Sequence, residues 1–325
     1  MLKYQIFYEA VNTYEVPLRE AVWQFIILPE DNDTQKLRFF QFSNSENIPY
    51  DQSVDGFLNS TIKLVTKKAL REITFTAHMD VEKKEINPFQ NIKNSTPGQD
   101  FKMIDDLVFK VDHEKFLFPT ALTSIPQQFQ KLFVFDRKET IFSNLCHLNQ
   151  WSFEYFTFKT EVTTTESSIT EILDQRKGVC QDFTHVFCGL ARLNGVPARY
   201  VSGYLHQNNT MVGDLQMHAW VECYIPGTGW VGFDPTNNLL AATHHIKVTH
   251  GRDYQDCAPL KGVIYLTGSG NNKTEYTVRV KEVKEFKERT QQEYRAEDFA
   301  EVKRDLENRF SNPSYLKWQQ QQQQQ

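Results

Sequence analysis

Residues 1 to about 85 alternate apolar and polar side chains with a period of two, which is typical of half-buried β-strands. Clusters of Asp, Asn and Ser interrupt this pattern several times, as turns between strands do. The alternating segments cover residues 3–8, 19–28, 36–42, 61–65 and 72–81. We therefore predict an N-terminal β-rich domain over residues 1–90, built as an antiparallel β-sandwich.

The pattern changes in a polar stretch from residue 84 to residue 100, which contains the turn-forming pairs Asn-Pro, Asn-Ser and Pro-Gly. We place a domain boundary there and treat residues 91–130 as a connection. Apolar residues then recur at helical spacing over about residues 137–151. A short helix is predicted over residues 165–175, and a second helix is predicted to begin close to Cys180.

Strand patterns return after these helices. They cover residues 198–205, 218–225, 230–234 and 276–283. Because helices come first and strands second, we predict an α+β catalytic domain over residues 131–284, in which the helix that carries Cys180 packs on an antiparallel sheet. Residues 285–325 are predicted to form a charged helical extension, followed by a disordered tail of seven glutamines.

Three residues of this domain, Cys180, His218 and Asp234, stand in the chain order of a thiol hydrolase triad. The nucleophile in such an enzyme is the thiolate, whereas a free thiol with a pKa near 8.5 is mostly protonated at neutral pH. A helix N-terminus carries the equivalent of about half a positive charge. Together with a neighbouring imidazolium, it stabilises the thiolate form. Cys180 at a helix start, His218 as base and Asp234 as orienter therefore satisfy the chemistry.

The hairpin that joins the last two of these residues allows a sharper prediction. If Ile225 pairs with Gly229, then Asp234 is a diagonal neighbour of His218 on the same face of the sheet. A register one residue longer would place the two side chains on opposite faces, because the side-chain period of a strand is two. We therefore predict a three- or five-residue loop, or a bulge, that uses Gly227 or Gly229.

Each triad residue alone favours a structural interpretation, and only the ordered set favours catalysis. Cys188 and Cys223 are rival nucleophiles, but Cys188 lies in the middle of the helix and Cys223 has the wrong parity relative to His218. His185 projects from another side of the helix than Cys180. The five cysteines contain no C-x-x-C pair, so we predict no metal site and no cofactor.

Composition limits the partners of the protein. A formal charge of −5 with scattered basic residues gives no positive patch for nucleic acid. No signal peptide is visible, and no apolar run approaches the roughly 20 residues that a membrane-spanning helix needs. We therefore expect a cytoplasmic protein without a membrane partner, whose oligomeric state the sequence leaves open.

The segment from Gly178 to His185, with the sequence GVCQDFTH, resembles the transglutaminase-like superfamily and its microbial cysteine protease branch. The likeness covers about residues 1–285, including the β-rich N-terminus. It continues through GVPARYVSGY at 195–204, HAWVE at 218–222, GWVGFDPTN at 229–237 and GRDY at 251–254. Thr184 and Met217 depart from the family pattern, where small residues are common.

This resemblance implies a papain-like α+β core in which Cys180, His218 and Asp234 form the triad, with no metal needed for the chemistry. It also implies acyl-enzyme chemistry on an amide, with water or an amine as the second substrate. The leading function is therefore a cysteine-dependent hydrolase of a peptide or protein substrate. An acyltransferase that joins glutamine to an amine is the alternative, and a non-catalytic binding module is a third possibility.

Overall fold

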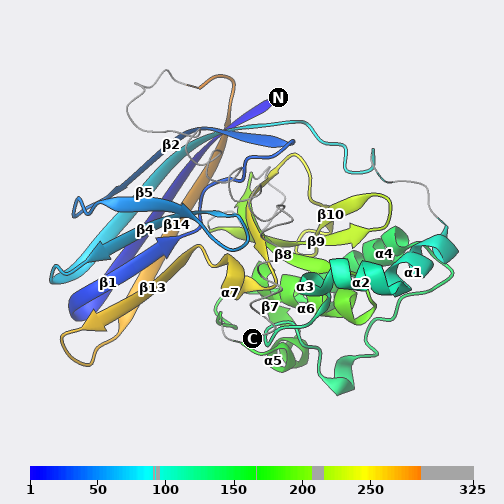
Figure 1. Ribbon diagram of the computed structural model, residues 1–325. Helices are drawn as coiled ribbons and strands as arrows, with labels where there is room; N and C mark the ends of the chain where they lie inside the picture. Colours follow the sequence, from blue (N-terminus) through cyan, green and yellow to red (C-terminus); the bar gives the residue numbers. More distant parts are fainter. Residues whose placement is uncertain (91, 93–95, 166, 207–215, 287–325) are drawn as a thin grey trace, which may run out of the picture.

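The computed structural model describes residues 1–90, 92, 96–165, 167–206 and 216–286. It has two parts, a large sheet built around the first strand and a helix-and-sheet unit beside it (Figure 1). This mixed α+β architecture with a β-rich N-terminal domain confirms the predicted fold class. The predicted helical extension and poly-Gln tail begin at residue 285 and lie almost entirely outside the described residues.

A seven-stranded antiparallel sheet forms the N-terminal domain, with the strand order β2-β5-β1-β4-β3 and with β13 and β14 also paired to β1. Its strands are β1 (Leu2–Phe25), β2 (Gln35–Asn44), β3 (Tyr50–Val54), β4 (Ser60–Thr66), β5 (Leu70–Lys83), β13 (Leu260–Leu266) and β14 (Asn272–Val283). The two halves of β1 have different partners. Residues 3–14 pair with β14, whereas residues 18–25 pair with β4 and β13.

Two expectations about this sheet were wrong. The first two predicted strands are one strand, because β1 runs through Pro17 and only shifts its register there against β5. Strands β13 and β14 lie within residues 131–284, which we expected to be catalytic, but both hydrogen bond with β1. Figure 1 shows β14, in orange, running beside the blue β1. The sheet therefore contains both ends of the described chain.

Alternate side chains of β1 build the core of this domain, as the period of two predicts. Tyr4, Tyr8, Trp23 and Phe25 are all buried. The same apolar cluster includes Tyr204, Ile246 and Val248 from the neighbouring unit. The two parts therefore share a hydrophobic core, which fixes the β domain against the sheet that carries the candidate site.

The connection at residues 91–130 contains helices that the sequence did not suggest. They are α1 (Pro97–Asp105), α2 (Leu107–Asp112), α3 (Glu114–Leu117) and the 3-10 turn η1 (Gln127–Phe129). Pro97 lies at the first position of α1, where a missing N–H costs nothing. Thr96 and Gln99 form a capping box around it. The Pro-Gly pair that we interpreted as a turn is therefore a helix start.

The predicted helices are present: the first two begin later than expected, and the third begins at Cys180 as predicted. They are α4 (Ile141–Tyr155), α5 (Ile169–Gln175) and α6 (Cys180–Leu193). Helix α4 starts after Thr140, and α5 starts after Ser168, because each of these side chains accepts a backbone N–H of the first turn. Helix α6 ends at Asn194, and Gly195 follows with φ of 82°.

A second antiparallel sheet packs against α6, and its strand order is β11-β10-β9-β8-β12. The strands are β8 (Ala198–Leu205), β9 (His218–Ile225), β10 (Gly229–Asp234), β11 (Leu239–Leu240) and β12 (His245–Gly251). A short parallel pair, β6 (Thr157–Phe158) and β7 (Lys177–Gly178), leads into α6, and α7 (Tyr254–Cys257) follows β12. The sheet presents its β8 and β9 strands to the helix that carries Cys180.

The hairpin between β9 and β10 has the predicted register. Ile225 pairs with Gly229 across a three-residue loop. Gly227 and Gly229 both have positive φ, at 72° and 99°, a conformation that side chains with a Cβ rarely adopt. The parity argument is therefore confirmed, and it places His218 and Asp234 on the same face of the sheet.

Candidate active site

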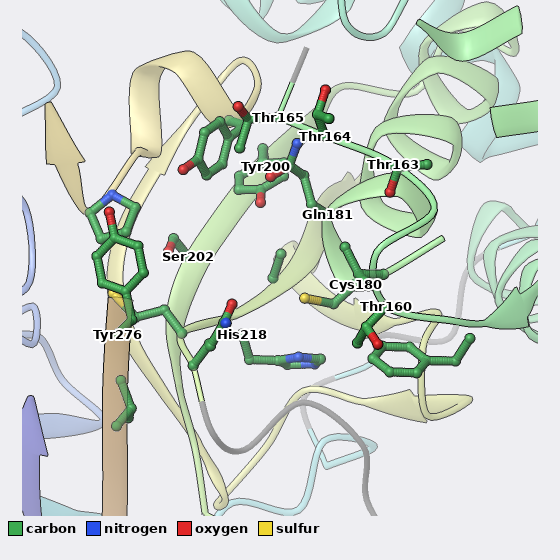
Figure 2. A pocket seen from close by; sticks show the side chains of 18 of the residues that line it. Thr160, Thr163, Thr164, Thr165, Cys180, Gln181, Tyr200, Ser202, His218 and Tyr276 are labelled. Carbon is green, nitrogen blue, oxygen red and sulfur yellow. The ribbon is translucent and has the colours of Figure 1, made fainter. Parts of the chain in front are cut away.

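The three predicted triad residues lie at the ends of three elements that meet. Cys180 is the first residue of α6, His218 is the first residue of β9, and Asp234 is the last residue of β10. Cys180 and His218 line the same cavity. Figure 2 shows the Cys180 sulfur directed into this cavity, with His218 beside it.

The position of Cys180 depends on the buried carboxylate of Asp182. This carboxylate accepts the Val179 N–H at 2.7 Å and the Thr163 hydroxyl at 2.7 Å. Burial raises the pKa of Asp182, and these two hydrogen bonds oppose the shift. A side chain at Gly178 would overlap Asp182. The Gly178 turn and the Asp182 cap therefore set the first turn of α6 and the direction of the Cys180 side chain.

The His218 imidazole donates from Nε2 to Oδ2 of Asp234 at 2.8 Å, and both side chains are fully buried. Burial acts to lower the pKa of His218, but Asp234 and Cys180 raise it above its ordinary value. Burial acts to raise the pKa of Asp234, but His218 and His245 hold it well below its usual range. The pair is therefore an imidazolium and a carboxylate.

The other ring nitrogen of His218, Nδ1, has no hydrogen-bond partner in the described part of the chain. Because Nε2 is occupied by Asp234, Nδ1 is the nitrogen that remains for the Cys180 thiol. The thiol is among the groups that raise the pKa of His218. His218 is therefore placed to exchange a proton with Cys180 while Asp234 fixes the orientation of the ring.

Asp234 accepts more hydrogen bonds than this one. Its Oδ1 accepts the backbone N–H groups of Thr236 and Asn237, at 3.0 and 3.2 Å. Its Oδ2 also accepts the Asn237 side-chain amide at 2.8 Å and His245 Nε2 at 3.0 Å. Such multiple donation stabilises an ionised carboxylate. Asp234 is therefore held in one orientation as well as in one charge state.

His245 is the functional candidate that the sequence analysis missed. Its Nδ1 accepts the Ala242 N–H at 3.4 Å. Its Nε2 therefore carries the hydrogen and donates a hydrogen bond to Asp234. Burial lowers the pKa of His245, which keeps the ring neutral. Strands β12 and β10 lie on opposite sides of β8 and β9 in the sheet. No local spacing in the sequence therefore indicates this contact.

The side chains of His218, Asp234 and His245 have ligand atoms within 4.8 Å of one another. In a tetrahedral zinc site with bonds of about 2.0 Å, ligand atoms lie roughly 3.3 Å apart. Here both Nε2 atoms lie at hydrogen-bond distance, 2.8 and 3.0 Å, from the same carboxylate oxygen. His245 Nε2 also carries a proton at the position where a metal ion would bind this nitrogen. The three side chains therefore fit a hydrogen-bond network better than a metal site.

The cavity has a volume of about 550 Å³ and is lined by both parts of the molecule. The helix-and-sheet unit supplies Phe158, Thr160, Thr163, Thr164, Thr165, Val179, Cys180, Gln181, Tyr200, Ser202, Gln216, Met217, His218, Ala219, Tyr254 and Pro259. The β domain supplies Tyr8, Tyr276 and Val278. A substrate at Cys180 would therefore contact both parts.

The rival residues are buried away from this cavity. Burial raises the pKa of Cys146 to about 11 and that of Cys188 to about 12. It also raises the pKa values of Cys223 and Cys257. These four thiols are therefore held protonated. His185 is buried, accepts the Tyr254 N–H at 3.2 Å, and its pKa is lowered to about 3 by burial and by Arg192, so it is a structural residue.

No helix in the described ranges is long and apolar enough to span a membrane.

The chain is 40% identical to an uncharacterized Mycobacterium tuberculosis protein over 134 residues, which are 38% of this chain and 42% of that protein. It is 29% identical to an uncharacterized Mycobacterium leprae protein over 294 residues, 86% of this chain and 98% of the relative. A protein-glutamine gamma-glutamyltransferase of Pseudomonas aeruginosa is 33% identical over 87 residues, 25% of this chain and 13% of that enzyme.

The fold itself has a solved counterpart. The structure of a Cytophaga hutchinsonii protein, whose name proposes a cysteine protease, superposes with a TM-score of 0.69 at 20% identity. The superposition covers 88% of this chain and 92% of the other. At this identity the likeness shows a shared fold that includes the N-terminal β domain.

The family model that matches the chain describes the transglutaminase-like superfamily and aligns with residues 134–235. Residues 134–235, which include Cys180, His218 and Asp234, therefore match a domain of the transglutaminase-like superfamily.

Proposed function

We propose that the protein is a cysteine-dependent amide or peptide hydrolase that works through a thioester on Cys180. The observation that carries this proposal is the 2.8 Å contact between His218 and Asp234 beside a cavity that Cys180 lines. A nucleophile at a helix start, a base and a group that orients the base are the components that acyl transfer needs. A cytoplasmic location remains a prediction.

Before the acylation step, the Cys180 thiol has given its proton to His218 Nδ1, which leaves a thiolate beside an imidazolium. The sulfur then attacks the carbonyl carbon of the substrate. The C–S bond forms, the C–N bond breaks, and His218 returns the proton to the leaving amine. The backbone N–H of Cys180 is one of the unpaired groups at the start of α6 and offers a hydrogen bond to the developing oxyanion. Asp234 stabilises the imidazolium until this proton leaves.

In the second step, His218 takes a proton from water, and the resulting hydroxide attacks the thioester. The C–S bond breaks, the carboxylic acid leaves, and the proton returns to the sulfur. A primary amine in place of water would give a new amide by the same proton transfers. This alternative is supported by the similarity to the Pseudomonas aeruginosa glutamyltransferase over 87 residues. Hydrolysis and amine transfer differ only in the acceptor that reaches the thioester.

The test is the rate of iodoacetamide labelling at Cys180 between about pH 4 and pH 9, followed by peptide mass mapping. Wild type is compared with His218→Ala and with His147→Ala, since His147 is a histidine with an exposed side chain on α4. We expect Cys180 to label fast well below pH 8 in wild type and in His147→Ala, and slowly in His218→Ala. Labelling of Cys180 no faster than Cys146 would overturn the proposal and favour a binding module.

A second measurement separates the two acceptors. Peptide substrates are incubated with the active protein, with and without a primary amine, and the products are weighed by mass spectrometry. Two fragments whose masses together equal that of the peptide plus one water, or a peptide in which a glutamine has become a glutamate, support hydrolysis. The transferase alternative is supported if adding the amine gives a product that carries the amine and lowers the amount of hydrolysed product.

A further inference from the structure

The wall of the cavity opposite Cys180 comes from the β domain. Tyr8 of β1 and Tyr276 and Val278 of β14 all line the cavity. Val278 pairs with Tyr8, and Tyr276 pairs with Ala10 two residues further along β1. Side chains two residues apart in a strand share a face, so these three form one surface. Figure 2 shows Tyr276 on the far side of the cavity from Cys180.

This wall is fixed in place. Tyr8 and Val278 are each about 1% exposed, and the rings of Tyr8 and Tyr276 lie 6.3 Å apart between centroids. Behind it, Tyr204 of the catalytic sheet packs in the same apolar cluster and donates its hydroxyl to the Ile27 carbonyl at 2.7 Å. Because the β domain shares its core with the catalytic unit, the distance between Tyr276 and Cys180 is set by the fold.

The charge of the cavity is as informative as its shape. Apart from the Cys180–His218 pair, the described side chains that line it are aromatic, aliphatic, hydroxyl or amide groups. No Asp, Glu, Lys or Arg of the described chain lines it. Enclosing an ionised side chain there without a partner would be unfavourable, because the charge would lose its hydration without gaining an opposite charge.

We propose that the β-domain wall formed by Tyr8, Tyr276 and Val278 is a specificity subsite, which selects an uncharged side chain on the residue that donates the acyl group to Cys180. This inference rests on the proposed thioester chemistry and adds a substrate class to it. It assigns to the N-terminal domain a direct role in binding. Tyr276 is the residue to change, because it is only partly buried and tolerates a polar replacement better than Tyr8 or Val278.

The experiment uses the full-length protein and three peptidyl chloromethyl ketones that differ only in a last residue of Leu, Glu or Lys. Each reagent alkylates a reactive thiol, with loss of chloride and formation of a C–S bond, so the readout is the rate of adduct formation at Cys180 by intact mass. We compare wild type with Tyr276→Glu and Tyr276→Lys. The matched control is Tyr265→Glu, because Tyr265 is an exposed tyrosine on β13 of the same sheet and does not line the cavity.

We expect wild type and Tyr265→Glu to react at least about tenfold faster with the Leu reagent than with either charged one. Tyr276→Glu should gain about tenfold toward the Lys reagent, and Tyr276→Lys should gain about as much toward the Glu reagent, because each supplies the missing opposite charge. Iodoacetamide labelling of Cys180 is measured in every variant and should stay fast. It reports the activation of the thiol independently of the subsite.

The outcomes separate the subsite from the chemistry. Fast iodoacetamide labelling with equal rates for the three reagents in wild type overturns the subsite and leaves the thioester proposal intact. Unchanged preferences in both Tyr276 variants overturn the role of the β domain. Slow iodoacetamide labelling of wild type contradicts the proposed function itself. The wild-type comparison needs no substitution, so a Tyr276 variant that fails to fold still leaves the subsite open to refutation.

Discussion

His245 Nε2 donates a hydrogen bond of 3.0 Å to the same Asp234 oxygen that His218 contacts at 2.8 Å. A neutral histidine thus supports the carboxylate that orients the candidate base. A hydrogen bond to a charged group is worth about 1.5–3 kcal/mol. His245 does not line the cavity itself, so any effect on catalysis would act through Asp234 and the His218 ring that it packs against.

Replacing His245 by Phe should therefore lower kcat about ten- to hundredfold and leave KM nearly unchanged, because the substrate wall is untouched. His245→Gln retains a donor and should recover part of the loss. The pH profile of Cys180 alkylation should shift in the Phe variant. A purely structural role would lower the thermal midpoint without moving that profile. His244→Gln is the matched control, since this neighbour contacts Tyr4 and His206 and not Asp234.

The contrast between His218 and His245 shows which contacts a sequence can predict. His218 and Asp234 lie on neighbouring strands joined by three residues, so side-chain parity alone decides whether they meet. His245 reaches Asp234 from β12, on the other side of the sheet. The pairing of β14 with β1 joins residues more than 250 positions apart. Such non-local pairings depend on the whole fold, and no local pattern encodes them.

Local signals also misled at specific residues. Separate strands were expected at residues 3–8 and 19–28, but β1 continues between them through Pro17, where only its register against β5 shifts. Pro97 and Gly98 suggested a loop, although Pro at the first position of a helix favours a helix start. In both places the residue type allows two structures. The tertiary partners decide between them.

Gly178→Ala should damage the start of α6. The new Cβ would overlap Asp182, whose carboxylate must then release the Val179 N–H or the Thr163 hydroxyl. Losing such a cap costs about 0.5–2 kcal/mol, and Cys180 should label more slowly with iodoacetamide because its helix turn is displaced. Gly98→Ala is the control, since a Cβ there meets nothing within 4 Å. Normal labelling in Gly178→Ala would contradict the positioning role of this turn.

Gln35 joins the β domain to β12. Its amide donates to the Lys247 carbonyl at 2.7 Å and accepts the Lys247 N–H at 3.0 Å, while Lys83 donates to the same oxygen at 3.2 Å. Gln35→Met would leave a buried N–H and a buried ammonium without this acceptor. Unsatisfied groups cost about 1–3 kcal/mol each. Urea unfolding should show a loss of about 2–5 kcal/mol for this variant. The exposed Gln52→Met on β3 should change little, and equal midpoints would refute the bridging role.

Two histidines with opposite pKa shifts give the unfolding free energy a maximum near pH 6.5. The pKa of His185 is lowered to about 3 by burial and Arg192. Below about pH 6.5 the unfolded chain binds a proton at this position and the folded chain does not. Stability therefore falls as the pH falls from about 6.5 toward 3, by up to about 1.4 kcal/mol per pH unit. Gln retains a side-chain acceptor for the Tyr254 N–H, so His185→Gln should remove the share of His185 from this acid limb. A smaller acid limb should remain, because burial also lowers the pKa values of His245 and His250.

His218 acts in the opposite direction. Burial opposes its charge, but Asp234 and Cys180 raise its pKa to about 10. Between about pH 6.5 and pH 10 the folded chain keeps a proton that the unfolded chain has lost, so the stability from this group is complete below pH 6.5 and is lost as the pH rises. His218→Gln should remove the slope between about pH 6.5 and pH 8, because the buried thiols, whose pKa values are also raised, add to the slope only at higher pH. Urea midpoints at about pH 6.5, 7.2 and 8 measure this slope, and midpoints at about pH 5 and 6.5 measure the acid limb. A slope between about pH 6.5 and pH 8 that persists in His218→Gln would show that the imidazolium beside Asp234 is not its source.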